Sequence, residues 1–291
     1  MLFGRIGRRK KLSDSSILNE QEENTLEKKT VWVLGSPRSG SSWLVERMLN
    51  LPTYNVIWNE PHIGSTLASR REAEGKRDPY FFSENHEKNW IPPLRKLILA
   101  RTYSHAKTIS KNVIIKEPNG SMGADLVMKC LPNSKFIWLL RDGRDVVDSF
   151  IDLHKEDSWN PEFKPITKDY RSTVIINHAK SWQKNTEIVE RAFQTHNSKL
   201  RLLIKYEDLR NNTFNHFKKI LQFLNISKTD EEIQKIIEKY DFENIPKEQK
   251  GPGKFNRSAK VGGWKLNFSN DEQHLLNNTI GSTLLKLGYE V

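Results

Sequence analysis

The sequence predicts an α/β fold in which a parallel sheet is flanked by helices on both faces. Four short apolar runs are typical of buried strands: VWVLG (31–35), NVIIKE (112–117), SKFIWLLRD (134–142) and RLLIKYEDL (201–209). Patterns typical of helices lie between or after these runs, at 122–131, 143–153, 171–196 and 213–225. Strands that alternate with helices favour a parallel sheet, because the connection between parallel strands is usually a helix.

A glycine loop, GSPRSGSSWL (35–44), follows the first strand, and the helical pattern SSWLVERMLN continues from it. Strand, glycine loop and helix form the arrangement of a phosphate-binding P-loop, whose backbone N–H groups hold an anion. The expected fold is therefore P-loop-NTPase-like. The loop lacks the usual lysine, since Ser41 stands at that place, and Arg38 supplies a cation inside the loop instead.

The chain of 291 residues fits one large domain or two small ones, and we expect one domain over 30–291. In residues 1–29 apolar residues do not recur at the spacing of a helix or a strand, and we expect this segment to form a basic and polar flexible tail. Residues 62–111 are less regular and contain three prolines. We expect this segment to pack beside the sheet as an insertion on the acceptor side.

The net charge of +11 indicates an anionic partner. The single cysteine, Cys130, excludes a disulfide framework and a cysteine-rich metal site. No run of 18 apolar residues is found, and the basic start lacks the apolar core of a secretory signal, so we expect a cytoplasmic protein. The five cations between Arg5 and Lys11 would allow peripheral contact with anionic lipid.

Two further cationic segments follow the loop. In FIWLLRDGRDVVDSF, Arg141 ends a strand at the carboxyl edge of the sheet, where α/β folds bind ligands. Ser149 lies about two helical turns further on, and an arginine with a hydroxyl suits a phosphate. The glycine-bearing loop FNRSAKVGGWKLNFS (255–269) adds Arg257 and two lysines. Three separate cationic segments favour a ligand with two anionic ends.

At these segments the sequence resembles the sulfotransferases that use 3′-phosphoadenosine-5′-phosphosulfate (PAPS), and the resemblance runs from Thr30 to the end of the chain. GSPRSGSSWL is similar to the family's 5′-phosphosulfate loop in its PRSG form. The resemblance implies that the loop binds the nucleotide through Arg38, Ser39, Gly40, Ser41 and Ser42. WLLRDGRDVVDSF is similar to the 3′-phosphate element, and it carries that element's arginine and serine to Arg141 and Ser149.

The same resemblance implies the adenine contacts. RLLIKYEDL is similar to the segment whose tyrosine approaches adenine, which points to Tyr206. Trp43 and Phe242 match the positions whose rings enclose the adenine. NRSAKVGGWKLNFS is similar to the family's RKGxxGDWKxxF loop and matches its arginine at Arg257, whereas Ser258 replaces its lysine.

The resemblance implies in-line transfer of the sulfuryl group from PAPS to an acceptor hydroxyl, with 3′,5′-ADP as the product and no required metal. Arg38 would stabilise the transferred group while staying protonated. The acceptor also needs a base. The histidine that cytosolic members carry after the equivalent of IIKEPNG is absent here, and Glu60, at the end of the apolar run VIWN, is the candidate. Glu117 and His62 are the alternatives, and Lys116 is expected near the sulfuryl group or the acceptor.

Two other functions stay open at the level of the sequence. A P-loop kinase or NTPase would need a loop lysine and a magnesium-binding aspartate, for which Asp142 is the candidate. A non-enzymatic polyanion-binding protein would explain the net charge, but no pattern typical of a nucleic-acid module is found, and no nucleic-acid partner is expected. The favoured acceptor is a glycan or a lipid-linked molecule, with small phenols and peptides as alternatives.

Overall fold

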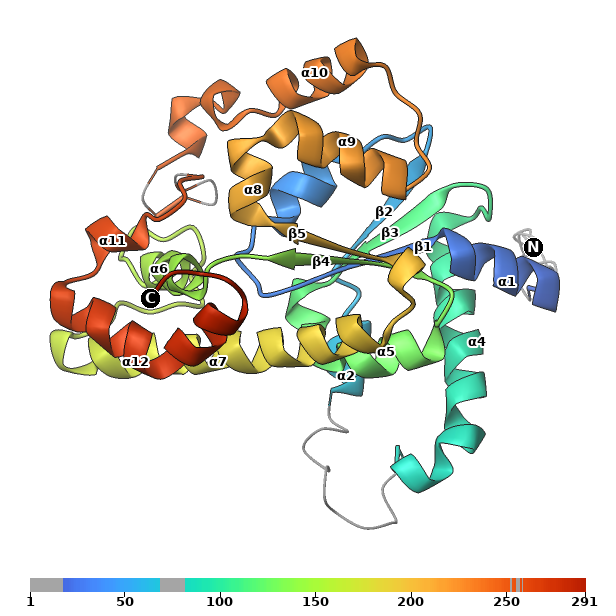
Figure 1. Ribbon diagram of the computed structural model, residues 1–291, viewed down its shortest axis with the longest axis horizontal. Helices are drawn as coiled ribbons and strands as arrows, with labels where there is room; N and C mark the ends of the chain where they lie inside the picture. Colours follow the sequence, from blue (N-terminus) through green and yellow to red (C-terminus); the bar gives the residue numbers. More distant parts are fainter. Residues whose placement is uncertain (1–17, 69–81, 252, 255–256, 258) are drawn as a thin grey trace, which may run out of the picture.

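The structure is a computed structural model and describes residues 18–68, 82–251, 253–254, 257 and 259–291. Its centre is a five-stranded sheet with the order β2-β3-β1-β4-β5, in which every pairing is parallel (Figure 1). The strands are β1 (Thr30–Leu34), β2 (Asn55–Asn59), β3 (Asn112–Lys116), β4 (Lys135–Leu140) and β5 (Arg201–Lys205). This sheet, with helices on both faces, confirms the predicted α/β, P-loop-NTPase-like class.

The central strand β1 shows why the sheet is buried on both faces. Trp32 pairs with Ile115 of β3 and with Phe136 of β4, and all three side chains are fully buried. Trp32 belongs to the apolar core on one face, whereas its neighbour Val33 belongs to the core on the other. Successive side chains of a strand point to opposite faces, so the continuous apolar run of β1 serves both cores.

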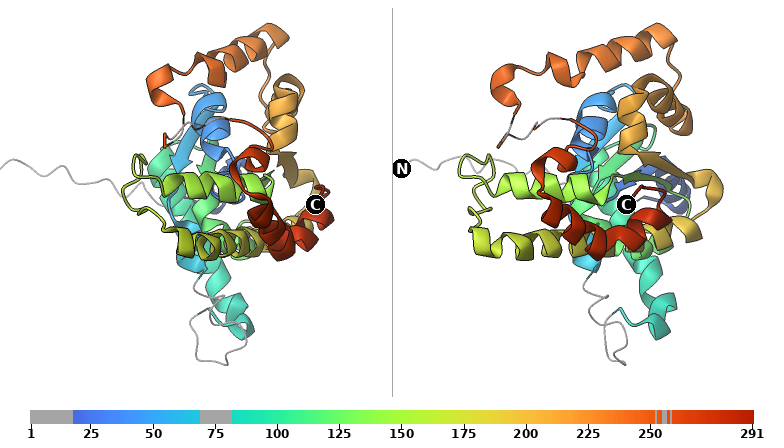
Figure 2. Two further views of the ribbon diagram at one scale, coloured as in Figure 1. Left: turned by 90° about the vertical axis from the view of Figure 1, so that its left-hand side faces the viewer. Right: turned by 60° about the vertical axis from the view of Figure 1, so that its left-hand side comes forward.

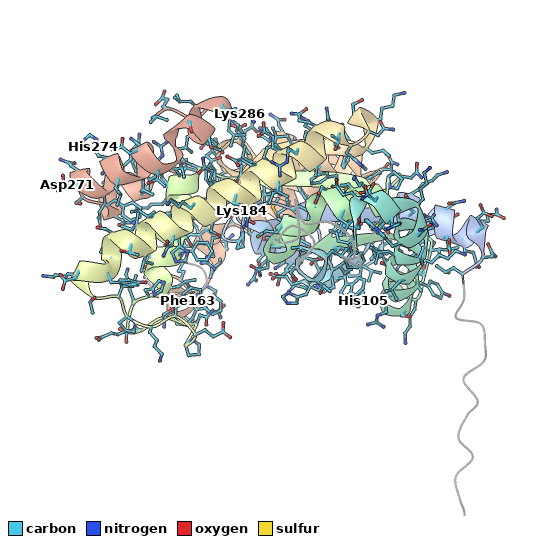
Figure 3. The ribbon with its side chains drawn as sticks, turned by 90° about the horizontal axis from the view of Figure 1, so that it is seen from below. His105, Phe163, Lys184, Asp271, His274 and Lys286 are labelled. Carbon is cyan, nitrogen blue, oxygen red and sulfur yellow. The ribbon has the colours of Figure 1, made fainter. Side chains whose placement is uncertain are left out.

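Helices pack on both faces of the sheet (Figure 2). One core includes side chains of α4 (Glu87–Ala106), α5 (Ala124–Cys130), α6 (Gly143–Leu153), α7 (Lys168–Thr195) and α12 (Asn270–Lys286). The other core includes side chains of η1 (Trp43–Met48), α8 (Tyr206–Asn211), α9 (Thr213–Phe223) and α10 (Asp230–Lys239). Figure 3 looks onto the first face, where α12 lies along the long helix α7.

Short segments connect these elements. They are α2 (Ile63–Leu67), η2 (Glu84–His86), η3 (Pro118–Gly123), η4 (Ser198–Leu200), η5 (Phe242–Asn244), η6 (Lys247–Gln249) and α11 (Trp264–Asn267). The four strands and four helices predicted by range are confirmed, and the predicted helix after the glycine loop is present, with a π-helical stretch in η1. The last predicted strand, 201–209, is too long, since the chain turns into α8 at Tyr206.

The flexible tail predicted over 1–29 is wrong for its last ten residues, which form the helix α1 (Glu20–Lys29). A capping box satisfies the first turn of α1. Arg95 of α4 binds Glu23 at 2.8 Å and Glu27 at 2.7 Å. The buried residues of α1 are Leu26, which packs in the apolar core, and the two glutamates bound by Arg95, so the helix has little apolar periodicity of its own. The basic cluster predicted to contact lipid lies in residues 1–17, outside the described part of the chain.

The segment 62–111, predicted to be irregular, contains the 20-residue helix α4. Pro92 and Pro93 lie inside this helix, although proline removes a backbone donor and usually ends a helix. The carbonyls that lose their donors belong to Lys88 and Asn89, and both residues are exposed to water, which can satisfy them. The role of 62–111 as an acceptor-side insertion stays a prediction. None of the helices in the described ranges combines the length and apolar character needed to cross a bilayer.

Candidate functional site

A cavity of about 440 Å³ opens at the carboxyl edge of the sheet. Most of the predicted site residues line it: Arg38, Gly40, Ser41, Ser42, Trp43, Glu60, Arg141, Ser149, Tyr206, Phe242 and Arg257. Four others do not: Ser39, Lys116, Glu117 and His62. The predicted residues meet because parallel strands deliver the segments that follow them to the same edge of a sheet.

The glycine loop between β1 and η1 forms one wall and is shaped by close approaches. Gly35 has φ of 154°, and a Cβ added there would lie 2.2 Å from the carbonyl oxygen of Leu139 in β4. Gly40 has φ of 91°, and a Cβ there would lie 2.6 Å from the ring of Tyr206. Only glycine fits either position. Between them Arg38 adopts a left-handed φ of 69°, a conformation that costs a non-glycine residue about 1–2 kcal/mol.

Two buried polar groups at this wall lack a hydrogen-bond partner. Ser39 is 1% exposed, and its Oγ contacts no donor or acceptor in the described part of the chain. The same holds for Nε of Arg141. A buried polar atom without a partner costs about 1–3 kcal/mol, so native proteins keep such atoms mainly where something else binds.

Three arginines converge in the cavity. Nε of Arg38 donates to Oγ of Ser149 at 2.9 Å, and Nη1 of Arg141 donates to the carbonyl oxygen of Arg38 at 2.9 Å. Burial lowers the pKa of Arg38 to about 10, with further lowering by the charges of Arg141 and Arg257. Arg38 therefore remains protonated at neutral pH, although like charges surround it. An anion bound among these groups would relieve that repulsion.

The helix α6 holds the late loop that carries Arg257. Asp148 of α6 forms an ion pair with Arg257. One turn earlier, Asp145 accepts the backbone N–H groups of Gly262 at 2.8 Å and Trp264 at 3.2 Å. One turn later, the carboxylate of Asp152 accepts the N–H of residue 253 at 2.9 Å. The acidic face of α6 thereby fixes the loop against the cavity, while Ser258, predicted to replace a phosphate-binding lysine, lies outside the described residues.

Aromatic side chains line the end of the cavity nearest α8. The rings of Trp43 and Tyr206 meet edge to face with centroids 6.3 Å apart. Nε1 of Trp43 donates to the carbonyl oxygen of Tyr240 at 2.9 Å, which links η1 to the segment that leads to Phe242. The guanidinium of Arg141 lies 4.4 Å from the ring centre of Tyr206. Phe242 also lines the cavity, and a planar ligand could lie against this group of aromatic side chains.

Lys116 lies beneath the cavity wall and joins two of the residues that line it. Its Nζ donates to Oγ of Ser42 at 3.1 Å and forms ion pairs with Glu60 at 3.0 Å and Glu46 at 2.7 Å. Lys116 is 2% exposed and does not line the cavity itself, so its expected place near the sulfuryl group or the acceptor stays a prediction. The amide of Asn119 also contacts the carboxylate of Glu60.

Glu117 and His62, the alternatives to Glu60, lie away from the cavity. Oε1 of Glu117 accepts the N–H of Gly64 at the start of α2, at 2.8 Å. Burial raises the pKa of Glu117 to about 7, with a smaller contribution from the charge of Glu60. His62 is exposed and has a left-handed φ of 61°. Of the three candidate bases, only Glu60 reaches the cavity surface.

The raised pKa of Glu117 predicts that the protein loses stability as pH rises. The carboxyl of Glu117 has a pKa near 4.5 in the unfolded chain and about 7 in the folded protein. Between these pH values the folded state binds more protons, so the free energy of unfolding falls as pH rises. From pH 5 to pH 8, Glu117 should lower the free energy of unfolding of the wild type by about 2–3 kcal/mol. The Glu117→Gln variant cannot ionise at this position and should lack that part of the decrease. Urea unfolding at both pH values measures this, and equal losses in the two proteins would contradict it.

The loop between α6 and α7 supplies a wall that the sequence did not predict. Its lining residues are Trp159, Asn160, Glu162 and Phe163, next to Phe150 and Leu153 of α6. The backbone N–H of Trp159 donates to the carbonyl oxygen of Gly253 at 2.9 Å, and its ring lies 6.0 Å from the guanidinium of Arg38. Its indole is 42% exposed. The sequence feature that could have indicated this wall is a tryptophan within a polar segment that contains prolines.

The sequence profile of a sulfotransferase family matches residues 30–231. Sulfotransferase 6B1 of Danio rerio is 24% identical over 229 residues, which cover 67% of this chain and 74% of the relative. Sulfotransferase 1E1 of Bos taurus is 25% identical over 284 residues, which cover 85% of this chain and 82% of the relative.

Solved structures share the fold. Mouse sulfotransferase SULT7A1 complexed with PAP has a TM-score of 0.59 and 17% identity, over 93% of this chain and 91% of that one. The sulfotransferase domain from the curacin biosynthetic pathway has a TM-score of 0.52 and 16% identity, over 90% and 98% of the two chains. At these identities the likeness extends to the fold alone.

Proposed function

Because the chain belongs to the sulfotransferase family, we propose that its arginine-lined cavity binds PAPS and that it transfers the sulfuryl group to a hydroxyl of a glycan or a lipid-linked acceptor. The family match supports sulfuryl transfer from PAPS, and a structure of similar fold was solved with PAP, the nucleotide product. The side chains of the cavity support the individual roles that follow.

One observation carries the proposal: Arg38, Arg141 and Arg257 line one cavity with Ser149, and Arg38 donates to the hydroxyl of Ser149. A guanidinium binds phosphate or sulfate oxygens through two donors at once, and a hydroxyl adds a third donor. Arg141, Ser149 and Arg257 would hold the 3′-phosphate. Arg38, which lies in the loop and reaches Ser149, would serve the 5′-phosphosulfate when that group is present.

The remaining contacts fit the other parts of the nucleotide. The unpartnered Oγ of Ser39 and the hydroxyls of Ser41 and Ser42 lie in the loop where phosphosulfate oxygens would need donors. The rings of Trp43, Tyr206 and Phe242 would enclose the adenine. The site therefore offers cations for both anionic ends and an aromatic slot for the base between them, as a nucleotide with phosphates on two sides of its ribose requires.

The transfer can be written as one balanced step, in which residues of the cavity handle the proton and the charge. The acceptor oxygen forms a bond to sulfur as the bond between sulfur and the phosphate oxygen breaks, and the electrons leave with 3′,5′-ADP. Glu60 would take the proton of the acceptor hydroxyl, held in place by Lys116 and Asn119. Arg38 would stabilise the charge that spreads over the sulfuryl oxygens and stay protonated throughout, since its pKa is about 10.

The wall formed by the α6–α7 loop supports the acceptor class. The exposed Trp159 lines the cavity together with Asn160 and Glu162, which carry an amide and a carboxylate. An aromatic face next to hydrogen-bonding groups suits a sugar ring, whose apolar face can lie on the indole while its hydroxyls bond to the polar groups. Phe150 and Leu153 extend an apolar surface in the same region, which would accept a lipid portion.

Nucleotide binding gives the first test. At 100 times its dissociation constant, 3′,5′-ADP should stabilise the folded protein by about 2.7 kcal/mol, which raises the melting temperature by roughly 5 °C. The Arg141→Ala variant should lose most of this shift, because it removes the guanidinium that contacts both the loop and Tyr206. Stabilisation by ATP with magnesium, and none by 3′,5′-ADP, would instead favour a kinase or NTPase.

The acceptor class is tested by transfer of labelled sulfate from PAPS to a panel of oligosaccharides, glycolipids, phenols and tyrosine peptides. We expect label on glycans or glycolipids. Trp159→Ala should raise KM for that acceptor about 3- to 10-fold, the usual contribution of one aromatic contact, and leave 3′,5′-ADP affinity unchanged. Tyr170→Ala, which removes an exposed ring of α7 outside the cavity, is the matched control. Label on phenols or peptides alone would contradict the proposed class.

A further inference from the structure

We propose that the chain carries a second anion site, specific for a phosphate group, at the amino ends of its strands. A cavity of about 350 Å³ lies there, away from the carboxyl edge that holds the first cavity. Its lining residues are Lys28, Lys29, Asn112, Asn133, Lys135, Leu200 and Asn225. Three are lysines, three are asparagines and none is acidic, a composition that favours an anionic ligand.

The fold brings these residues together from five segments of the chain, which include Asn112 at the start of β3 and Leu200 of η4. Lys28 and Lys29 end α1, just before β1 begins, and Lys135 is the first residue of β4, which pairs with β1. Asn133 lies in the turn before β4, and Asn225 follows α9 with a left-handed φ of 58°. Figure 1 shows α1 at one end of the sheet, with α6 and α8 at the other.

Positive charges are concentrated in this cavity. Lys135 is only 8% exposed, and its Nζ donates to the carbonyl oxygen of Phe223 at 2.7 Å. Its pKa is lowered by burial and by the charge of Lys29. Glu27, which directly precedes Lys28 and Lys29, is the nearest acidic residue in the sequence. Its carboxylate already accepts the N–H of Asn133 at 2.8 Å and forms an ion pair with Arg95. Lys29 and Lys135 therefore repel each other, and an anion bound beside them would reduce that repulsion.

The donors indicate a phosphate group rather than a nucleotide base. Lysine ammonium groups act on phosphate as point charges with three donors each, and asparagine amides add directed N–H groups. The amide of Asn112 is already bonded to Asn55 and to the carbonyl oxygen of Leu224, so we assign the ligand contacts to the exposed lining residues Asn133 and Asn225. No aromatic residue is among the lining residues described, so a base would find no ring to stack on.

Two sources could supply the phosphate group: a free phosphate compound, or the headgroup of an anionic lipid. The chain begins with five cations between Arg5 and Lys11, upstream of the helix that supplies Lys28 and Lys29. Both sources present the same phosphate group to the lysines, and the experiment described below distinguishes them. A purely structural alternative is that Lys28 and Lys29 stabilise the carboxyl end of α1, where cations are favourable.

The test is calorimetric titration of inorganic phosphate into the protein saturated with 3′,5′-ADP, so that the first cavity is filled. We expect the Lys28→Gln, Lys29→Gln double variant to bind phosphate at least tenfold more weakly than the wild type. The matched control is Lys155→Gln, Lys286→Gln, which removes two cations outside the cavity and should change affinity less than twofold. Lys135 is left intact because its buried side chain supports the fold.

Vesicles of phosphatidylcholine, with and without phosphatidylinositol phosphate, form the second arm. Sedimentation with the anionic vesicles that depends on Lys28 and Lys29 identifies a lipid headgroup as the source. Binding of free phosphate without such sedimentation identifies a soluble compound. If the double variant lowers thermal stability while binding phosphate and vesicles as the wild type does, the lysines only stabilise α1 and the proposal is wrong.

Discussion

Replacement of Arg38 by alanine should lower kcat for sulfuryl transfer about 100- to 1000-fold, the usual effect of removing one donor that stabilises transition-state charge. Arg38 reaches from the glycine loop to Ser149, and its pKa of about 10 keeps it charged during the reaction. The same substitution should weaken 3′,5′-ADP binding far less, since Arg141 and Arg257 remain. Single-turnover rates with PAPS and calorimetry with 3′,5′-ADP separate the two effects.

Arg38→Lys is the control for charge. Lysine keeps the cation but loses the planar guanidinium that bonds to Ser149 through Nε. We expect this variant to recover part of the lost rate. A rate unchanged in Arg38→Ala, or a loss that appears only as weaker nucleotide binding, would show that Arg38 positions the nucleotide without stabilising the transferred group.

Replacement of Glu60 by glutamine should lower kcat by about 100- to 10,000-fold, the range for loss of a general base. The amide has the size of the carboxylate and can keep the contact with Asn119, but it cannot take the acceptor proton. The nucleotide should bind as before. Initial rates at saturating PAPS and acceptor measure the change.

Glu46 offers a matched control, because it also binds Lys116 but does not line the cavity. Glu46→Gln should therefore leave kcat within a few-fold of the wild type. If Glu60→Gln retains full activity while Glu117→Gln or His62→Ala loses it, the base is one of these alternatives. Equal losses in Glu46→Gln and Glu60→Gln would mean that both residues act only by holding Lys116.

The sequence predicted the sheet and the convergence of cations for one physical reason. Buried parallel strands are continuous apolar runs, and the residues that follow them must meet at one edge. Arg38 and Arg141 follow such runs, so their approach could be expected before any contact was known. Tyr206 was predicted inside the strand 201–209, whereas it begins α8, because the backbone turn after Lys205 is not encoded in an apolar pattern.

The parts that sequence could not predict are held by contacts between distant segments. The helix α1 depends on Arg95, which lies far along the chain, and α4 continues through Pro92 and Pro93 because exposed carbonyls tolerate the missing donors. The buried position of Lys116 beneath the cavity wall depends on its ion pairs with Glu46 and Glu60, which lie on other segments of the chain. The Trp159 wall depends on a backbone contact with Gly253.

The backbone of Gly253 connects the loop that carries Arg257 to the α6–α7 loop that carries Trp159. The N–H of Gly253 is held by Asp152, and its carbonyl oxygen is held by the N–H of Trp159. Neither loop can swing outward without breaking a bond that the other shares. If either loop must move for a product to leave, this hydrogen bond would couple the movement of the two loops, and so the release of nucleotide to the release of acceptor.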